Sequence, residues 1–265
     1  MKEITIDEAK KLQLEILKKV SAFCDENNIR YFIYYGTYLG AIRHGGFIPW
    51  DDDIDICMPR PDYDRFMDIF KAPDLAVFTW RKDNKILVPF SKVYDTRTEL
   101  HENGDFGEKY GVNIDIFPVD GLPSGEGKLK NRVKYMKFCW GMQVGATIDD
   151  YSKRRKSKQI QIKLMKAFYA IFHCKHYLAG RTIVHAKKYD FDKSDKVAVL
   201  VWGYGMREVN NKSDILPLRK IKFEDGEFWA PHNDMPLKNA FGDYMQLPPE
   251  DQRKYKHLPK MNWKE

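Results

Sequence analysis

The chain has 265 residues, of which 43% are hydrophobic and 31% are charged, and its formal net charge is +7 at pH 7. This length and composition are typical of one elaborated soluble domain with a substantial core. No apolar run approaches the length of a membrane span, and the N-terminal residues MKEITIDEAKK lack the apolar segment of a signal peptide. We therefore expect a cytoplasmic protein, either free or at the inner face of the cell membrane.

The positive charge balance indicates which partners to expect. Basic residues outnumber acidic ones by 45 to 38, which favours anionic partners such as nucleotide phosphates, lipid-linked pyrophosphates or an acidic membrane face. No recognition-helix, zinc-finger or RNP-type pattern points to a nucleic-acid partner.

The first predicted element is a helix that begins near the N-terminus. Thr5 and Glu8 have the spacing of a capping box, and apolar residues then recur at helical intervals up to Cys24. Asn27 and Asn28 end the pattern. We expect this helix to pack on a central sheet and to take no part in the chemistry.

A predicted buried strand, IRYFIYY, occupies residues 29–35, and Gly36 and Thr37 end it just before the short helical turn YLGAIR. Glycine lets the backbone approach a ligand closely, and the free N–H groups at the start of a helix favour a phosphate. Arg43 and His44 follow the turn and can donate hydrogen bonds to phosphate oxygens. The alternative for Arg43 and His44 is an ordinary surface pair.

The densest group of acids follows directly: Asp51, Asp52, Asp53 and Asp55. On a strand, the side chains of Asp51, Asp53 and Asp55 would share one face, while Ile54 and Ile56 would pack on the other. Asp52 would face away from the other acids. Carboxylates this close repel one another unless a cation neutralises them, and a hard divalent ion such as Mg²⁺ or Mn²⁺ suits oxygen ligands.

This segment has two alternatives to a catalytic metal site. A calcium-binding EF-hand loop would require a glycine at position 56 and a glutamate at position 62, where the chain has Ile56 and Asp62. A solvated acidic turn is the other alternative, although such a turn does not need isoleucines between its acids.

The next predicted elements are a helix started by Pro61 and the short strands LAVFTW, ILVPF, SKVYD and RTEL between residues 75 and 100. We expect these strands to extend the sheet, with Lys92 and Arg97 directed toward the phosphates or, alternatively, on a solvated face. A strand within GVNIDIFPVDG then places Asp115 between Ile114 and Ile116. Asp115 is either a third site carboxylate or a polar residue on a half-exposed strand.

Helical patterns dominate residues 126–190. The first is KLKNRVKYMKFCWGMQV, and the second, SKRRKSKQIQIKLMKAFYAIFHCKHYLAG, combines a basic start with a long apolar run. One interpretation of the second is a core helix with a solvated basic end. The other is an amphipathic surface helix that rests on anionic lipid as a peripheral membrane contact.

The last segment gathers aromatic residues, and we expect them to lie in one region: Trp202, Tyr204, Phe228, Trp229 and Tyr244. For any single one of them, ordinary aromatic core is the alternative.

The order of a strand, Gly-Thr, a short helix and an Asp-x-Asp strand resembles the nucleotidyltransferase superfamily typified by DNA polymerase β. The motifs GTYLGAIRHGGFIPWDDDIDICMPRPDY, VNIDIFPVDG and FGDYMQLPPEDQRKYKH narrow this resemblance to the LicD family of phosphocholine transferases, relatives of fukutin and fukutin-related protein. The resemblance implies an α+β fold with a DNA polymerase β-like nucleotidyltransferase mixed-sheet core and added helices. It covers nearly the whole chain.

The resemblance also implies a function. We expect transfer of phosphocholine from CDP-choline to a sugar hydroxyl of a cell-surface glycan precursor, of the teichoic acid or lipopolysaccharide type, with Mg²⁺ or Mn²⁺ as the cofactor. The expected metal ligands are Asp51, Asp53, Asp55 and Asp115, the last of which would also accept the attacking hydroxyl's proton. The expected substrate-binding residues are Gly36, Thr37, Arg43, His44, Lys92, Trp202 and Tyr204, with Trp202 and Tyr204 facing the quaternary ammonium of choline.

Alternatives to this function remain open. Relatives of this fold transfer other alcohol phosphates such as ribitol phosphate, and a metal-dependent glycosyltransferase also uses an Asp-x-Asp motif. A non-catalytic binding protein is the third possibility. We expect one LicD-type domain made of a catalytic core (1–125), a helical insertion (126–190) and a C-terminal substrate-binding segment (191–265).

Overall fold

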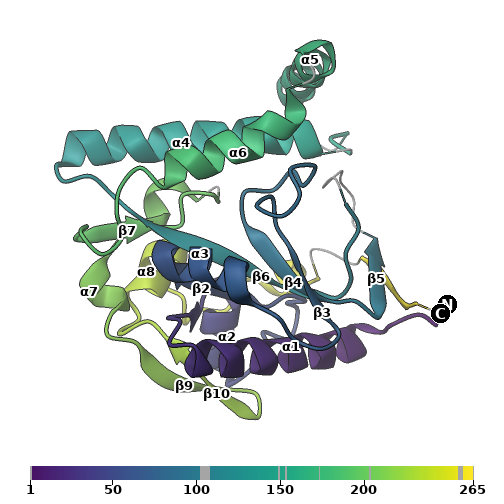
Figure 1. The fold of residues 1–265 in the computed structure, drawn as a ribbon, viewed down its shortest axis with the longest axis vertical. Coiled ribbons are helices and arrows are strands. Elements are labelled where there is room, and N and C mark those ends of the chain that lie inside the picture. The colour runs from purple at the N-terminus through teal and green to yellow at the C-terminus, as the bar shows by residue number, and fades with distance from the viewer. Residues whose placement is uncertain are drawn as a thin grey trace.

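A computed structural model describes residues 2–101, 108–148, 150–152, 154–172, 174–202, 204–255 and 259–264. A central mixed sheet has helices on both faces. In the view of Figure 1, α4 (Glu126–Thr147), α5 (Lys156–Phe172) and α6 (Lys175–Ala186) lie above the sheet and α1 (Ile6–Glu26) runs beneath it. The two ends of the chain lie side by side, since the Ile4 N–H donates to the Met261 carbonyl oxygen at 2.8 Å. The expected combination of a mixed sheet with added helices is confirmed, and the DNA polymerase β-like core stays a prediction.

The central sheet has the strand order β1-β2-β6-β4-β3. Its strands are β1 (Phe32–Ile33), β2 (Asp55–Pro59), β6 (Asn113–Gly121), β4 (Ser91–Asp95) and β3 (Leu75–Phe78), with β7 (Lys196–Ala198) and β8 (Asn210–Asn211) added beyond β6. Strands β2 and β6 run parallel, and the other pairs are antiparallel. The parallel pair matters most, because it carries two of the predicted acids.

The two faces of the sheet have separate cores. Ile56 and Ile116 face the first core together with α1 (Ile6–Glu26) and α3 (Arg60–Ile69). Phe117 and Val119 point to the opposite face, where α4 (Glu126–Thr147) packs. The predicted start of α1 is confirmed, because the Thr5 hydroxyl accepts from the Glu8 N–H at 3.2 Å and the Glu8 carboxylate accepts from the Thr5 N–H at 3.0 Å.

The segment around Gly36 and Thr37 differs from the expectation. The predicted strand at 29–35 is reduced to Phe32–Ile33, and α2 (Tyr35–His44) begins before the glycine and takes both residues into its first turn. Aromatic and β-branched residues favour a strand locally, but here the extended backbone ends at Tyr34, whose N–H still donates to the Asp55 carbonyl oxygen at 2.9 Å. The chain turns into α2 at Tyr35, and the rings of Tyr34 and Tyr35 pack against one another with centroids 4.7 Å apart. Tertiary packing has overridden the local preference.

The predicted strands between residues 75 and 100 are only partly confirmed. LAVFTW and SKVYD contain β3 and β4, but ILVPF forms no strand and RTEL overlaps β5 (Thr98–His101), which pairs with β11 (Lys260–Trp263) outside the central sheet. The side chains of Ile86 to Val88 are nevertheless buried. An apolar run therefore reached the core without entering the sheet's hydrogen-bond ladder.

The second predicted helix of residues 126–190 is two helices, α5 (Lys156–Phe172) and α6 (Lys175–Ala186). The rest of the chain forms a hairpin and short helices: β9 (Arg219–Phe223), β10 (Gly226–Ala230), α7 (Lys212–Ile215), α8 (Met235–Phe241) and the 3₁₀ turns Gly205–Glu208 and Glu250–Gln252. The division into segments 1–125, 126–190 and 191–265 stays a prediction, and strands β7 and β11 join the last of them to the first by pairing with β6 and β5. In the described ranges, no helix has both the length and the apolar character needed to cross a bilayer.

Candidate active site

Two of the predicted acids are brought together by strand pairing. Asp55 is the first residue of β2, and it lies directly opposite Asp115 in the parallel register of β2 and β6. Alternate residues of a strand share a face, so Asp115 lies on the face of Phe117, and Ile114 is buried on the other. The prediction that Ile54 and Ile56 pack away from the acids is also confirmed, since both are fully buried in the first core.

The other three acids do not lie on a strand, which corrects the expectation of alternation from Asp51 to Asp55. Residues 51–54 precede β2 without regular structure. Asp51, Asp52 and Asp53 each offer one carboxylate oxygen, and these oxygens lie within 4.8 Å of one another. Asp52 therefore does not face away from its neighbours, because alternation of side chains applies only where the backbone is extended.

The acids act on one another electrostatically. Burial, followed by the charges of Asp51 and Asp115, raises the pKa of Asp53 well above its usual value. Burial and the charges of Asp53 and Asp115 do the same to the pKa of Asp55. Lys92 is the cation that opposes both shifts. Carboxylates that oppose one another's ionisation and offer only oxygen ligands fit a hard divalent cation such as Mg²⁺ or Mn²⁺.

Lys92 is held inside the site. It lies opposite Asp115 in the β4–β6 register, is buried, and donates from Nζ to Asp115 Oδ1 at 2.6 Å and to Asn113 Oδ1 at 3.3 Å. The expected contact with phosphate stays a prediction. What the structure adds is an ion pair that fixes the position of the Asp115 carboxylate and balances part of its charge.

The Gly-Thr pair joins α2 to the acids. A side chain on Gly36 would place its Cβ 2.3 Å from Asp51 Oδ2, so only glycine allows this carboxylate to approach the helix. The Thr37 hydroxyl is buried and accepts a hydrogen bond from the Asp55 N–H at 2.8 Å. This bond ties the first turn of α2 to the first residue of β2. Phosphate binding by Gly36 and Thr37 stays a prediction.

Arg43 and His44 lie at the far end of α2. The Arg43 guanidinium donates to the Tyr244 carbonyl oxygen at 2.9 Å, which holds the closing segment of the chain beside the helix. The His44 ring lies edge-on to the Trp50 ring, and burial together with the Arg43 charge lowers the pKa of His44. Contacts of either residue with phosphate remain predictions.

An aromatic cluster borders the acids on the same face of the sheet. The Trp202 ring contacts three others, with centroid distances of 5.5 Å to Phe117, 5.7 Å to Phe90 and 5.8 Å to Trp140. Tyr204 is partly exposed and lies edge-on to Tyr35 at 5.7 Å. Burial, then the charges of Glu208 and Asp55, raises the pKa of Tyr204, so this phenol lies within the electrostatic reach of the acids.

The expectation that five aromatic residues of the last segment gather in one region is wrong. Phe228 is buried in the core on the opposite face of the sheet. Trp229 donates from Nε1 to Asp25 at 2.8 Å, and the Tyr244 hydroxyl donates to Asp234 at 3.2 Å. Trp202 instead finds its ring partners on β6, α4 and the segment before β4, because these surround the face that carries Asp115.

A buried polar network beneath the aromatic cluster was missed by sequence reasoning. The Tyr35 hydroxyl donates to Glu208 Oε1 at 2.8 Å, and the Asn210 amide donates to the Tyr34 hydroxyl at 2.9 Å. Burial raises the pKa of Glu208 to about 8. No local signal marks Glu208, because its partner lies 173 positions away in the chain.

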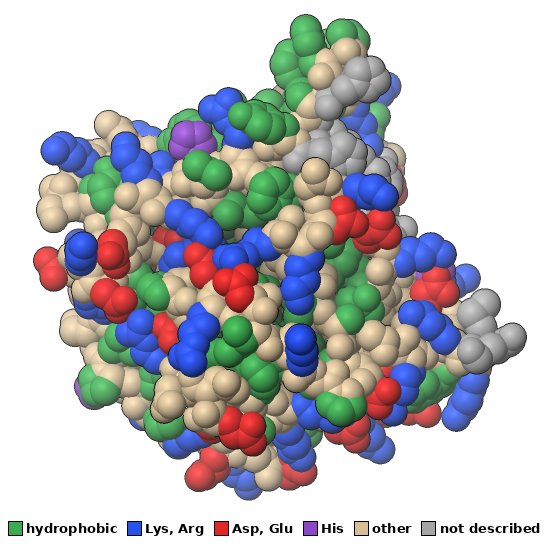
Figure 2. All heavy atoms as spheres, viewed as in Figure 1, with side chains coloured by type: hydrophobic (Ala, Val, Ile, Leu, Met, Phe, Trp, Pro, Cys, Tyr) green, Lys and Arg blue, Asp and Glu red, His purple; other side chains and the backbone are tan. Residues whose placement is uncertain are grey.

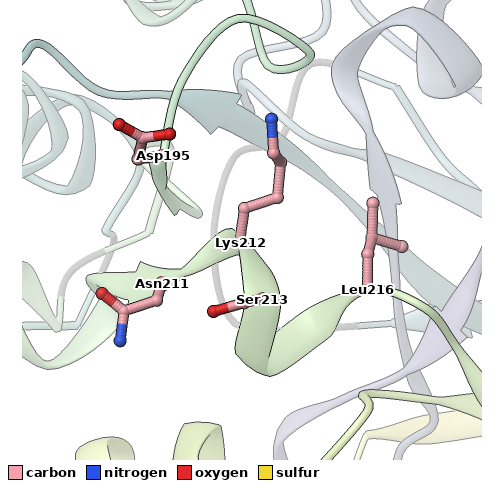
Figure 3. A pocket seen from close by; sticks show the side chains of 5 residues that line it. All are labelled: Asp195, Asn211, Lys212, Ser213 and Leu216. Atoms are coloured by element: carbon pink, nitrogen blue, oxygen red, sulfur yellow. The ribbon is translucent and has the colours of Figure 1, made fainter.

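A shallow pocket opens elsewhere on the surface, beside α7. Figure 3 shows its lining side chains, which are Asp195, Asn211, Lys212, Ser213 and Leu216. The Lys212 ammonium donates to the carbonyl oxygens of Asp192 at 2.7 Å and Phe191 at 3.5 Å. Its one lining cation thus holds the neighbouring loop, and the pocket contains none of the predicted site residues.

Comparison with known proteins bears on the same region. Residues 28–138, which include the acids and the Gly-Thr pair, match the family described as LicD/FKTN/FKRP, nucleotidyltransferase domain. The chain is 28% identical over 272 residues to the lipopolysaccharide cholinephosphotransferase LicD of Haemophilus influenzae, covering 97% of this chain and 98% of that protein. An uncharacterized protein of Rickettsia typhi is 41% identical over 90 residues, or 33% of this chain and 28% of that protein. The expected resemblance to LicD is confirmed.

Proposed function

From the match of residues 28–138 to the LicD/FKTN/FKRP nucleotidyltransferase-domain family, we propose that this chain is a transferase that moves phosphocholine from CDP-choline to a sugar hydroxyl of a cell-surface glycan precursor. The full-length similarity to a lipopolysaccharide cholinephosphotransferase supports this reaction class. One structural observation carries the proposal: an acid cluster that suits a metal-bound pyrophosphate lies on the same sheet face as aromatic rings that suit a quaternary ammonium.

The acid cluster is the proposed metal centre. Asp51, Asp53, Asp55 and Asp115 would hold Mg²⁺ or Mn²⁺, which when bound neutralises charge on the donor's pyrophosphate and on the phosphoryl group during transfer. Thr37 holds Asp55 at the start of its strand through the hydrogen bond to the Asp55 N–H. Gly36 leaves room for the Asp51 carboxylate against α2. These two residues therefore position the acids, whatever contact they make with phosphate.

The transfer step needs a base. The acceptor sugar hydroxyl forms a bond to the β-phosphorus of CDP-choline, the bond from that phosphorus to the oxygen of CMP breaks, and the hydroxyl proton must leave. We propose Asp115 as the base that accepts this proton, and Lys92 holds its carboxylate through a hydrogen bond of 2.6 Å. Arg43 and His44 are the proposed donors to the leaving CMP.

The aromatic cluster is the proposed seat of the choline group. A quaternary ammonium is attracted to aromatic faces, and each face contributes about 0.5–2 kcal/mol depending on how far it is desolvated. Trp202 and the partly exposed Tyr204 are the proposed contacts. The Glu208 carboxyl below Tyr35 adds a polar group that the sequence did not suggest.

Phosphorus NMR tests the proposal directly. Purified protein is incubated with CDP-choline, Mg²⁺ and a panel of acceptor sugars. CMP together with a new phosphodiester signal is the expected result, and the same reaction with Asp55→Asn is the negative control. Consumption of another CDP-alcohol while CDP-choline stays intact would overturn the choline assignment. Release of nucleoside diphosphate from a sugar nucleotide would identify a glycosyltransferase, and no turnover of any donor would favour a binding protein.

A further inference from the structure

Helix α5 presents an apolar row to the surroundings. Ile160, Leu164 and Ile171 are 59%, 67% and 70% exposed, and their spacing of four and seven residues places them on one face. The opposite face packs on α4, where the buried Tyr169 donates from its hydroxyl to the Met142 carbonyl oxygen at 3.2 Å. Helix α5 is thus apolar on both faces, and only one of them is covered.

The exposed apolar residues of the chain concentrate around this helix. Of the 16 large apolar side chains that are exposed in the described residues, nine belong to α4, α5 and α6: Tyr135, Phe138, Ile160, Leu164, Phe168, Ile171, Phe172, Tyr177 and Val184. Figure 2 shows hydrophobic side chains gathered at the top of the molecule, where α5 projects. A concentration of this kind marks an interaction surface.

The same region is strongly basic. Residues 151–189 contain eleven Lys and Arg residues and no Asp or Glu. Lys156 and Lys163 are exposed and lie four residues before and three residues after Ile160, so they flank the apolar row on its own face. Two copies of this chain that met through α5 would bring these positive charges together. The charge therefore disfavours self-association and favours an anionic partner.

We propose that α5 is a membrane-contact helix that lies along an anionic bilayer, with Ile160, Leu164 and Ile171 inserted at the boundary of the head groups and the lysines on lipid phosphates. An apolar row flanked by lysines is the pattern of interfacial helices, in which the two contributions add. Each Lys or Arg near an anionic surface strengthens the binding, and salt reduces this contribution.

Helix α4 connects this surface to the candidate active site. Trp140 of α4 contacts the Trp202 ring, and Met142, two residues further along, accepts the hydrogen bond that fastens α5. The membrane contact itself does not require the transfer reaction. A role for this contact in bringing the active site to an acceptor anchored in a bilayer rests on the proposed function.

Vesicle flotation of the full-length protein tests the contact. Vesicles of phosphatidylcholine alone are compared with vesicles that also contain phosphatidylglycerol, at low and high salt. We expect binding to the anionic vesicles that falls at least tenfold at high salt, and little binding to neutral ones. The double variant Leu164→Gln/Ile171→Gln should bind at least tenfold more weakly, whereas Ile69→Gln, the same kind of change at an exposed apolar residue of α3, should bind like the wild type.

Charge reversal provides a second pair of variants that does not depend on how the apolar variant folds. Lys156→Glu/Lys163→Glu should weaken binding far more than Lys71→Glu/Lys222→Glu, which changes the net charge equally at exposed lysines away from α5. Equal binding by the two lysine variants, or no binding of the wild type to anionic vesicles, would overturn the proposal. So would a dimer in solution that Leu164→Gln/Ile171→Gln abolishes. Release of CMP with a soluble acceptor is a separate readout, so the proposed function can fail while the membrane contact stands.

Discussion

At Asp53 and Asp55, exchanging a carboxylate for an amide removes charge with little change in shape. We expect Asp53→Asn or Asp55→Asn to lower turnover by roughly 100-fold or more, because each would remove a metal ligand. The metal-free protein should melt at the same temperature or higher, since the fold disfavours the ionised form of both residues. Turnover and thermal unfolding in EDTA measure the two effects. Asp7→Asn, on the exposed first turn of α1, should not change turnover, and an active Asp55→Asn would refute the metal assignment.

Glu208 should make the stability of the protein depend on pH. Its pKa is about 8 in the folded protein against an ordinary value of 4.5, so the folded state holds a proton that the unfolded state releases between these values. The contribution to stability is therefore fully present below about pH 4.5, declines as the pH rises, and is lost above about pH 8. Urea unfolding at pH 5.5 and pH 8.5 should show a smaller decline for Glu208→Gln than for the wild type, by a few kcal/mol at most. Equal declines would contradict the raised pKa.

Trp202 is the residue that should distinguish choline from other alcohols. Trp202→Ala should raise the KM for CDP-choline by about 2- to 30-fold, the equivalent of about 0.5–2 kcal/mol, and lower kcat less. A CDP-linked alcohol without an ammonium group serves as the matched comparison, because its KM should change little. If both donors weaken equally, Trp202 supports the fold of the site rather than binding choline.

The contact between α2 and β2 shows how the packing of a helix against a strand builds this site. The sequence predicts that the Gly-Thr pair binds phosphate. In the structure, the pair is also the point at which α2 contacts the acid-bearing segment and strand. The need for glycine at position 36 becomes visible only in the structure, because the Asp51 carboxylate that it accommodates lies 15 positions further along the chain. A helix placed this closely leaves no room for a side chain.

Substitution of Gly36 tests this packing. Gly36→Ala places a methyl group 2.3 Å from Asp51 Oδ2, so the Asp51 carboxylate must move, and we expect lower metal affinity and lower turnover with a modest loss of stability. Gly127→Ala is the matched control, because a methyl group there meets nothing within 4 Å and alanine favours a helix. Calorimetric titration with Mn²⁺ reports the affinity. Unchanged Mn²⁺ binding by Gly36→Ala would show that Asp51 is not part of the metal site.

For the whole molecule, the acid cluster should couple metal binding to folding. An ion that binds the folded chain and not the unfolded one stabilises it by mass action, by about 2.7 kcal/mol when its concentration is 100 times its dissociation constant. We expect Mn²⁺ to raise the melting temperature of the wild type in a concentration-dependent way and EDTA to reverse the effect. Asp55→Asn should respond much less. The same rise in both proteins would place the bound ion elsewhere.

Much of the architecture could be predicted from local patterns. The capping box at Thr5 and Glu8, the start of α3 beside Pro61, the strand around Asp115 and the helical character of 126–190 all depend on patterns within a few residues. The errors also have a common origin. Composition favours strands at residues 29–35 and ILVPF, and alternation favours one at residues 51–54, but only the parts that could pair with a neighbouring strand joined the sheet.

The sequence by itself determined the kind of site: its acids, its Gly-Thr pair, and the family whose domain matches these residues. Only the tertiary structure decided how the site is assembled, with Asp115 paired to Lys92, Asp52 beside Asp51 and Asp53, Trp202 on Phe117 and Glu208 under Tyr35. The physical reason is the range of the interactions. Caps, turns and periodicity act between near neighbours in the chain and are visible in the letters. Contacts across the sheet depend on strand register and on helix packing, which the whole chain settles together.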